Sequence, residues 1–462
     1  MDIKLYNSLG KREEVFKPIN SGKVGLYSCG PTVYFTAHIG NFRSFILSDI
    51  VRRIFEFNGY EVKQVMNITD VGHLTDDADQ GEDKVLVEAI RQGKSMQEVA
   101  GPVIAQFEKD LASLKIKKPH HMPKASEHIP QMIKLIEKLF ENGLVYILSD
   151  GIYFDTQRIE NYGKLATVDM NGLLAGARVE VNSEKRHPFD FAVWKFSKSD
   201  KKGMSFETEW GWGYPGWHIE CSAMSREYLG QPFDIHTGGV DHVNVHHTNE
   251  IAQSEGAFGI PLANYWLHGE FLLSGESKMS KSEGSLYTLE DLEKEGISAL
   301  EFRYFTFTAH YRTQLKFSLE SLKATATALR NLKNELSEFP TPTKPDESYL
   351  NLFNEGINND LNMPQALSVL WQMMRSSQDK AIIHATLLKM DEVLGLDLNT
   401  SYEISESVQQ LVKEREKARL KNDWKESDRL RKLINMEGFE VEDTSEGQKL
   451  KYVATITNVE HN

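Results

Sequence analysis

The stretch CGPTVYFTAHIGN, residues 29–41, constrains the fold most, because it lies between a predicted strand and a predicted helix. The strand is the apolar run at residues 23–28, and the helix covers residues 41–58, where apolar side chains recur at helical spacing. A second strand over residues 61–68 follows directly. Alternation of this kind is typical of a parallel sheet, and it predicts the first half of a Rossmann-like domain.

The end of this stretch carries groups that suit a polyphosphate. His38 and Asn41 have side-chain N–H groups at the predicted start of a helix, and Gly40 lets a ligand approach the backbone closely. Taken by itself, a histidine near the start of a helix is more often a helix cap or a packing residue than a ligand-binding residue. Further along the chain, KMSKS contributes Lys278 and Lys281 in a loop rich in Ser and Gly, which suits adenylyl chemistry. The alternative is a solvated basic turn.

A candidate metal site combines residues from distant segments. Only two cysteines occur, Cys29 and Cys221, and a single disulfide is not expected in a cytosolic protein. In the segment HHTNE, which is predicted to be helical, His246 and Glu250 share one face at i and i+4. His247 and Glu250, at i and i+3, would serve nearly as well, and spacing does not separate the two histidines. Two thiols, one imidazole and one carboxylate suit tetrahedral zinc; otherwise the cysteines are core residues and the histidines are satisfied by hydrogen bonds.

The two signatures, HIGN and KMSKS, resemble the HIGH and KMSKS signatures of class I aminoacyl-tRNA synthetases. With Cys29 just before the first signature, and PGWHIECSAMS and HHTNEIAQSEG between the two, the chain resembles the cysteinyl-tRNA synthetases from about residue 5 to about residue 443. Asn41 stands where the class pattern has a second histidine, and it keeps an N–H donor. The resemblance implies activation of L-cysteine with ATP and Mg²⁺ to cysteinyl-adenylate, and transfer to the 3′ end of tRNA(Cys). It also implies one Zn²⁺ per chain, which binds the substrate as a thiolate.

The resemblance implies roles for individual residues as well. It selects a zinc ligand set of Cys29, Cys221, His246 and Glu250. It assigns ATP binding to His38, Gly40, Asn41 and Lys281, and catalysis to His38, Asn41, Lys278 and Lys281. The residues implied for the amino-acid pocket are Gly30, Thr32, Trp217, His236 and Asp241. Those implied to face the anticodon are Arg419, Trp424, Asp428 and Asp443. A charged helical pair with Trp424 packed inward would show the same pattern.

The predicted fold class is α/β: a Rossmann-like catalytic domain with a connective insertion, then a helical bundle and a small α+β C-terminal domain. The expected segments are the first catalytic half at 1–115, the connective insertion at 116–196, the second catalytic half at 197–264, a KMSKS-bearing connecting region at 265–317, the helical bundle at 318–398, an anticodon-binding domain at 408–452 and a tail at 453–462. The insertion is too short for a separate editing domain.

Charge and composition limit the partners. The net charge of −14 argues against indiscriminate binding of nucleic acid, so a tRNA must meet a local basic face. No run of 18 apolar residues occurs, so we expect a cytoplasmic protein without membrane contact.

Two rival functions remain at this stage. A cysteine:amino-sugar-inositol ligase of mycothiol synthesis shares both signatures and the zinc site, but it lacks the anticodon-type domain. A non-enzymatic, zinc-dependent nucleic-acid-binding protein would leave KMSKS and the nucleotide fold unexplained.

Overall fold

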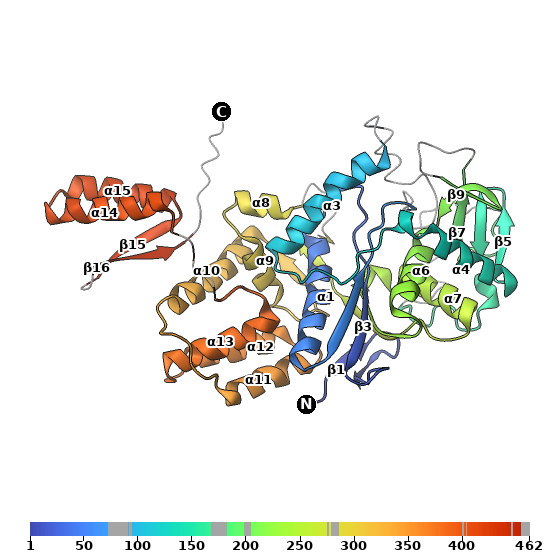
Figure 1. The fold of residues 1–462 in the computed structure, drawn as a ribbon, viewed down its shortest axis with the longest axis horizontal. Helices are drawn as coiled ribbons and strands as arrows, with labels where there is room; N and C mark the ends of the chain where they lie inside the picture. Colours follow the sequence, from blue (N-terminus) through green and yellow to red (C-terminus); the bar gives the residue numbers. More distant parts are fainter. Residues whose placement is uncertain are drawn as a thin grey trace.

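The computed structural model describes residues 1–72, 91, 95–167, 183–197, 205–274, 277–278, 286–399, 402, 404–444 and 447–453, and the statements below concern these residues. At its centre is a parallel sheet with the strand order β11-β10-β3-β4 (Figure 1). Its strands are β3 (Lys23–Ser28), β4 (Glu61–Met66), β10 (Phe233–Gly239) and β11 (Ala263–Gly269). The predicted α/β fold class is therefore confirmed.

A further segment extends the sheet beyond β4. Parallel bridges join Val65 to His121 and Ile68 to Lys124, and the N–H of Met66 donates to the carbonyl of His121. Residues 121–124 therefore belong with the sheet in space, although they fall in the range expected to form the connective insertion.

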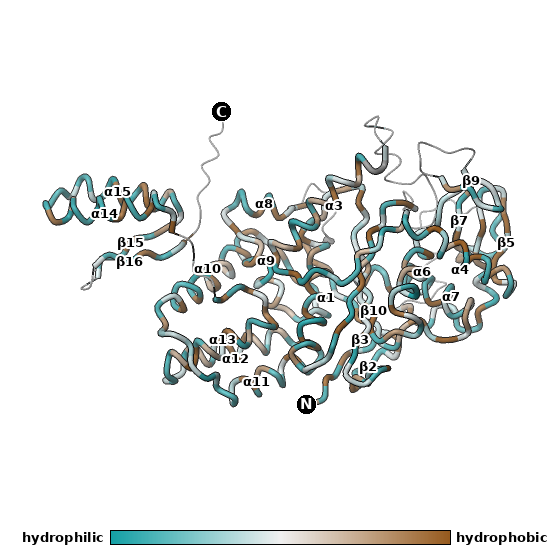
Figure 2. Tube along the Cα trace, in the orientation of Figure 1, coloured by the Kyte–Doolittle hydropathy of each residue, from teal (hydrophilic) through white to brown (hydrophobic). Residues whose placement is uncertain are grey.

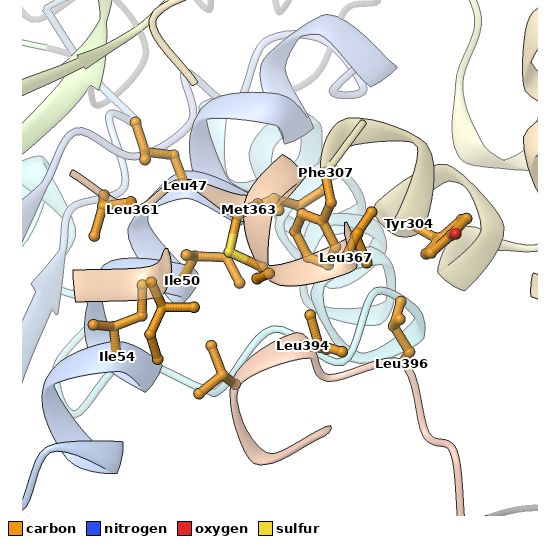
Figure 3. Close-up of a cluster of buried hydrophobic side chains, with 14 of the residues drawn as sticks. Leu47, Ile50, Ile54, Tyr304, Phe307, Leu361, Met363, Leu367, Leu394 and Leu396 are labelled. Atoms are coloured by element: carbon orange, nitrogen blue, oxygen red, sulfur yellow. The ribbon is translucent and has the colours of Figure 1, made fainter. Parts of the chain in front are cut away.

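Helix α1 (Ile39–Phe57) connects β3 to β4 and begins two residues before the predicted start. The reason is its cap: the Gly40 N–H donates to Nδ1 of His38 at 3.1 Å, and the His38 N–H donates to Oδ1 of Asn41 at 3.1 Å. The first signature is thus the start of a helix that points into the site. Figure 3 shows the apolar side of α1 packed against the helical region, with Ile50 beside Met363.

The second half of the sheet carries helices α6 (Trp217–Leu229) and α7 (His246–Phe258). Between the halves lie α3 (Met96–Ser113), α4 (Ile129–Glu141) and an antiparallel sheet of order β5-β6-β7-β9-β8. The strands of that sheet are β5 (Val145–Leu148), β6 (Gly151–Phe154), β7 (Phe191–Phe196), β8 (Phe206–Thr208) and β9 (Gly211–Pro215). The hairpin of β1 (Lys4–Asn7) and β2 (Arg12–Val15) lies beside β11.

The chain becomes mainly helical after the central sheet. A small sheet of β12 (Leu272–Ser274), β13 (Ser277–Lys278) and β14 (Leu315–Phe317) leads into it. The helices are α8 (Leu289–Lys294), α9 (Ala299–Thr306), α10 (Leu319–Leu336), α11 (Glu347–Asn358), α12 (Met363–Met374) and α13 (Lys380–Leu394). Helix α11 lies inside the range 318–398 that was predicted to form a helical bundle, follows the proline-rich residues 340–345 and is capped by Asp346. Within the described residues, no helix is both long enough and apolar enough to cross a bilayer.

The C-terminal unit consists of α14 (Glu406–Leu420), α15 (Trp424–Met436), β15 (Phe439–Thr444) and β16 (Gly447–Tyr452). It projects from the rest of the molecule and contacts it at α10 (Figure 1). Its two helices are mostly hydrophilic (Figure 2), and its own core is small, with Val408, Ile434, Phe439 and Val441 buried.

Candidate active site and metal centre

A cavity of about 390 Å³ lies at the carboxyl ends of β3 and β10, where ligands of open parallel sheets bind. Both the start of α1 and the segment after β11 contribute to its wall. The predicted site residues that line it are Cys29, Gly30, Thr32, His38, Gly40, Asn41, Trp217 and Asp241. Glu270 and Phe271 line it too, and sequence analysis missed both because no motif marks them.

A buried cluster of metal-ligating groups adjoins this cavity. The ligand atoms of Cys29, His246, His247 and Glu250 all lie within 4.8 Å of one another. The Nε2 atom of His246 is 3.0 Å from Oε1 of Glu250, and Sγ of Cys29 is 3.2 Å from Nε2 of His247. Cys221 is buried close enough for Cys29 and His246 to influence its pKa, but it is not one of these four residues. The structure thus brings together three of the predicted zinc ligands, Cys29, His246 and Glu250, with His247 in the place expected for Cys221.

Two groups of the cluster hold negative charge at neutral pH. Burial raises the pKa of Glu250, but the charges of His236 and His246 and their hydrogen bonds outweigh it and lower the pKa to about 2. The hydrogen bond from Cys29 lowers the pKa of Cys221 to about 6 against the effect of burial, whereas burial raises the pKa of Cys29 well above its usual value. Burial lowers the pKa of His246, but the charges of Glu250 and Cys221 outweigh it and raise the pKa to about 10, so the imidazolium balances part of this negative charge. A bound metal cation would take over that role.

The donor set fits zinc. Tetrahedral zinc takes sulfur at about 2.3 Å and nitrogen or oxygen at about 2.0 Å, so its ligand atoms stand roughly 3.3–3.8 Å apart. The separations in the cluster bracket that range. The ligands are sulfur, imidazole nitrogen and carboxylate oxygen, which zinc accepts together.

A second layer of histidines orients the ligands. His236, which the resemblance implied for the amino-acid pocket, does not line the cavity. It is fully buried behind the cluster, where its Nε2 is 3.0 Å from Oε2 of Glu250. His268 holds His247 from behind, with 2.7 Å between Nε2 and Nδ1, and its own Nδ1 is 2.8 Å from Oγ of Ser8. Partners of this kind fix the orientation of ligating side chains.

Two pocket residues have clear steric roles. A Cβ atom on Gly30 would lie 1.6 Å from the carbonyl oxygen of Asn67, so only glycine fits there. The indole of Trp217 stacks on the imidazole of His246, with ring centroids 4.4 Å apart. Trp217 therefore joins the cavity wall to the metal cluster.

The second signature is only partly described. Lys278 lies in β13 and is described by its backbone alone, and Lys281 lies outside the described residues.

The four residues implied for the anticodon lie in the C-terminal unit. Trp424 is 56% exposed, so the alternative in which it packs inward is wrong. The guanidinium of Arg419 lies 5.5 Å from its ring centroid and pairs with Asp443 at 2.9 Å. Arg415 and Arg431 also pair with Asp443, at 2.8 and 3.4 Å, and Asp428 is exposed on α15. Sequence analysis missed Arg415 and Arg431, whose pairing with a strand residue depends on how β15 packs against the helices.

Comparisons with known proteins agree with this geometry. The family described as "tRNA synthetases class I (C) catalytic domain" matches residues 15–327. A cysteine–tRNA ligase 1 of Burkholderia lata is 46% identical over 456 residues, covering 97% of each chain. A cysteine–tRNA ligase of Treponema denticola is 42% identical and covers 96% of this chain and 98% of its own.

Solved structures show the same fold at greater distance. Methionyl-tRNA synthetase of Mycobacterium tuberculosis in complex with methionyl-adenylate superposes with a TM-score of 0.55 at 15% identity, covering 81% of this chain and 90% of that one. The relatives are 42–46% identical over nearly the full length of the chain, and the matched catalytic domain covers residues 15–327. The chain therefore belongs to the cysteine–tRNA ligase family of the class I tRNA synthetases.

Proposed function

We propose that the protein attaches L-cysteine to tRNA(Cys) through cysteinyl-adenylate. One observation carries the proposal: Cys29 belongs both to the wall of the cavity formed by the first signature and to the buried metal-ligating cluster. A substrate in this cavity can therefore meet nucleotide-binding groups on one side and a thiol-selective centre on the other.

In the first step, the cysteine carboxylate attacks the α-phosphorus of ATP, and pyrophosphate leaves. The carboxylate is itself the nucleophile, so no serine or histidine base is needed. His38, Gly40 and Asn41 stand at the start of α1, where N–H donors and the helix dipole suit the triphosphate. ATP enters with Mg²⁺, and Lys278 and Lys281 neutralise the charge that develops on the phosphates.

Selection of cysteine is assigned to the cluster. Cys29, Cys221, His246 and Glu250 would hold one zinc ion, with His247 as the competing fourth donor. When bound, zinc favours a thiolate over a hydroxyl as ligand, which separates cysteine from serine without an editing site. His236 keeps the Glu250 carboxylate in place, and Asp241 on the cavity wall can accept a hydrogen bond from the substrate ammonium group.

In the second step, a hydroxyl of the terminal ribose attacks the adenylate carbonyl, and AMP leaves. We assign residues 408–452 to anticodon binding, because an exposed tryptophan beside an arginine cluster suits unstacked bases. The presence of this unit argues against the amino-sugar-inositol ligase, which lacks an anticodon-type domain.

The test compares cysteine with serine in ATP–pyrophosphate exchange. The purified protein should catalyse cysteine-dependent exchange, with serine activated roughly 10⁴-fold less efficiently. Equal exchange with both amino acids would refute selection by the cluster, and absence of exchange would leave only a nucleic-acid-binding protein. Charging of tRNA and coupling to an amino sugar, measured side by side, separate the two ligases.

A further inference from the structure

Arg43 lies in α1 shortly after the first signature and is buried. Its Nη1 donates to the carbonyls of Glu270 at 2.7 Å and Phe271 at 2.5 Å. Its Nη2 donates to the carbonyls of Thr313 at 2.6 Å and His310 at 3.3 Å. All four acceptors are backbone oxygens, and they come from two loops more than 220 residues away.

Among the described residues, no Asp or Glu oxygen lies within 4.0 Å of the Arg43 guanidinium. Burial lowers the pKa of Arg43 to about 10, and the charge of Glu270 offsets only part of that effect, so the side chain stays protonated at neutral pH. A buried cation is costly to folding unless it is hydrogen-bonded, so the four carbonyl groups have to stay in place around Arg43.

The loops that Arg43 holds belong to the cavity wall and its support. Gly269, Glu270, Phe271 and Leu272 line the same cavity as the start of α1. The Glu270 N–H donates to the carbonyl of Tyr311 at 2.8 Å, which joins the wall to the second loop. Asp360 braces that loop, because it accepts hydrogen bonds from the Tyr311 hydroxyl and from Nε of Arg312, each at 2.7 Å.

We propose that Arg43 is a positioning residue for ATP: it holds the wall at residues 269–272 against the start of α1, so that the nucleotide meets both sides of the cavity at once. The proposal rests on the proposed function, in which this cavity takes ATP. Arg43 does not itself line the cavity; it acts through the backbone of Glu270 and Phe271.

The same helix offers a matched control. Arg53 stands ten residues further along, about 15 Å away at the helical rise, and is equally buried. It donates to the carbonyls of Glu392 at 2.9 Å and Lys115 at 2.5 Å, and it pairs with Asp49 at 2.7 Å. None of these residues lines the cavity. Replacing Arg53 therefore removes comparable buried contacts without releasing the wall.

The experiment compares Arg43→Met, Arg43→Lys and Arg53→Met with the wild type. The KM values for ATP and cysteine are taken from pyrophosphate exchange, ATP affinity from calorimetry and the thermal midpoint from scanning calorimetry. In Arg43→Met, the KM for ATP should rise about tenfold or more while the KM for cysteine stays within about twofold. Arg43→Lys should recover part of the loss, since an ammonium group also donates to carbonyls. Arg53→Met should lower the thermal midpoint and leave the KM for ATP unchanged.

Two results would overturn the proposal: an ATP KM in Arg43→Met equal to that in Arg53→Met, or an equal rise in both KM values. If Arg43→Met does not fold, Arg43→Lys against Arg53→Lys makes the same comparison. Failure of the proposed function is distinguishable, because a wild type without cysteine-dependent exchange can still show weaker calorimetric ATP binding in the Arg43 variant. A wild type that binds no ATP overturns both.

Discussion

The metal cluster and the C-terminal unit both gather charged side chains around a carboxylate, but they do so in opposite surroundings. Glu250 is fully buried and is held by His236 and His246, whereas the side chain of Asp443 is 27% exposed among three arginines. Water screens the pairs that Asp443 forms with Arg419 and Arg431, so each of these contributes little alone, whereas Arg415 is buried. Water cannot screen a buried charge such as Glu250, so removing one of its partners is costly to folding. Single substitutions should therefore be severe in the cluster and graded in the C-terminal unit.

The largest effect is expected for the metal ligands. If Cys221 is one of the four donors of the proposed zinc site, Cys221→Ala should reduce zinc from about one per chain to near zero and lower adenylate formation by roughly 10³-fold, because a tetrahedral site then loses one donor. The measurements are metal content by mass spectrometry and pyrophosphate exchange.

His247→Ala is the matched variant, since it removes the competing donor from the same cluster. If Cys221→Ala keeps its zinc and His247→Ala loses it, the fourth ligand is His247, and the assignment of Cys221 fails.

An intermediate effect is expected at the tip of the C-terminal unit. Trp424→Ala should lower tRNA charging about tenfold, because stacking of a base on an aromatic ring contributes roughly 1–3 kcal/mol. Pyrophosphate exchange should not change, since that step needs no tRNA. Leu420→Ala is the control: Leu420 is 80% exposed and lies four residues before Trp424. Equal losses in both variants would mean that exposed apolar surface, and not stacking, is what the tRNA contacts.

The smallest effect is expected where the C-terminal unit meets α10. Asn334 donates to the carbonyl of Tyr452 at 2.9 Å and accepts from its N–H at 3.2 Å. Asn334→Ala should lower tRNA charging only about threefold, because Arg330 of α10 still donates to the carbonyl of Val453 and keeps the unit beside α10.

Thr327→Ala is the control for that variant, because Thr327 is exposed on the same helix and its hydroxyl bonds only to the helix backbone. A loss of charging as large as that of Trp424→Ala would show that the placement of the unit, and not its surface, limits the reaction.

The sequence alone was most informative where structure is local. Alternating strands and helices, the helical spacing of HHTNE and the start of α1 depend on neighbours along the chain. The limit of that approach lies in contacts between distant segments: the bridges from His121 to Val65 and from Lys124 to Ile68 fall in the range expected to form the connective insertion.

By itself, then, the sequence determined the α/β fold class, the two signatures and a candidate set of metal-ligating residues, because hydrophobic periodicity and residue chemistry can be recognised within short segments. The tertiary structure alone decided which distant groups meet. It placed His236 behind Glu250, brought His268 to His247 and gave Arg43 four carbonyl acceptors from two loops. It also left Trp424 exposed. The physical reason is that such contacts depend on how whole elements pack, and that packing joins residues with no fixed spacing along the chain.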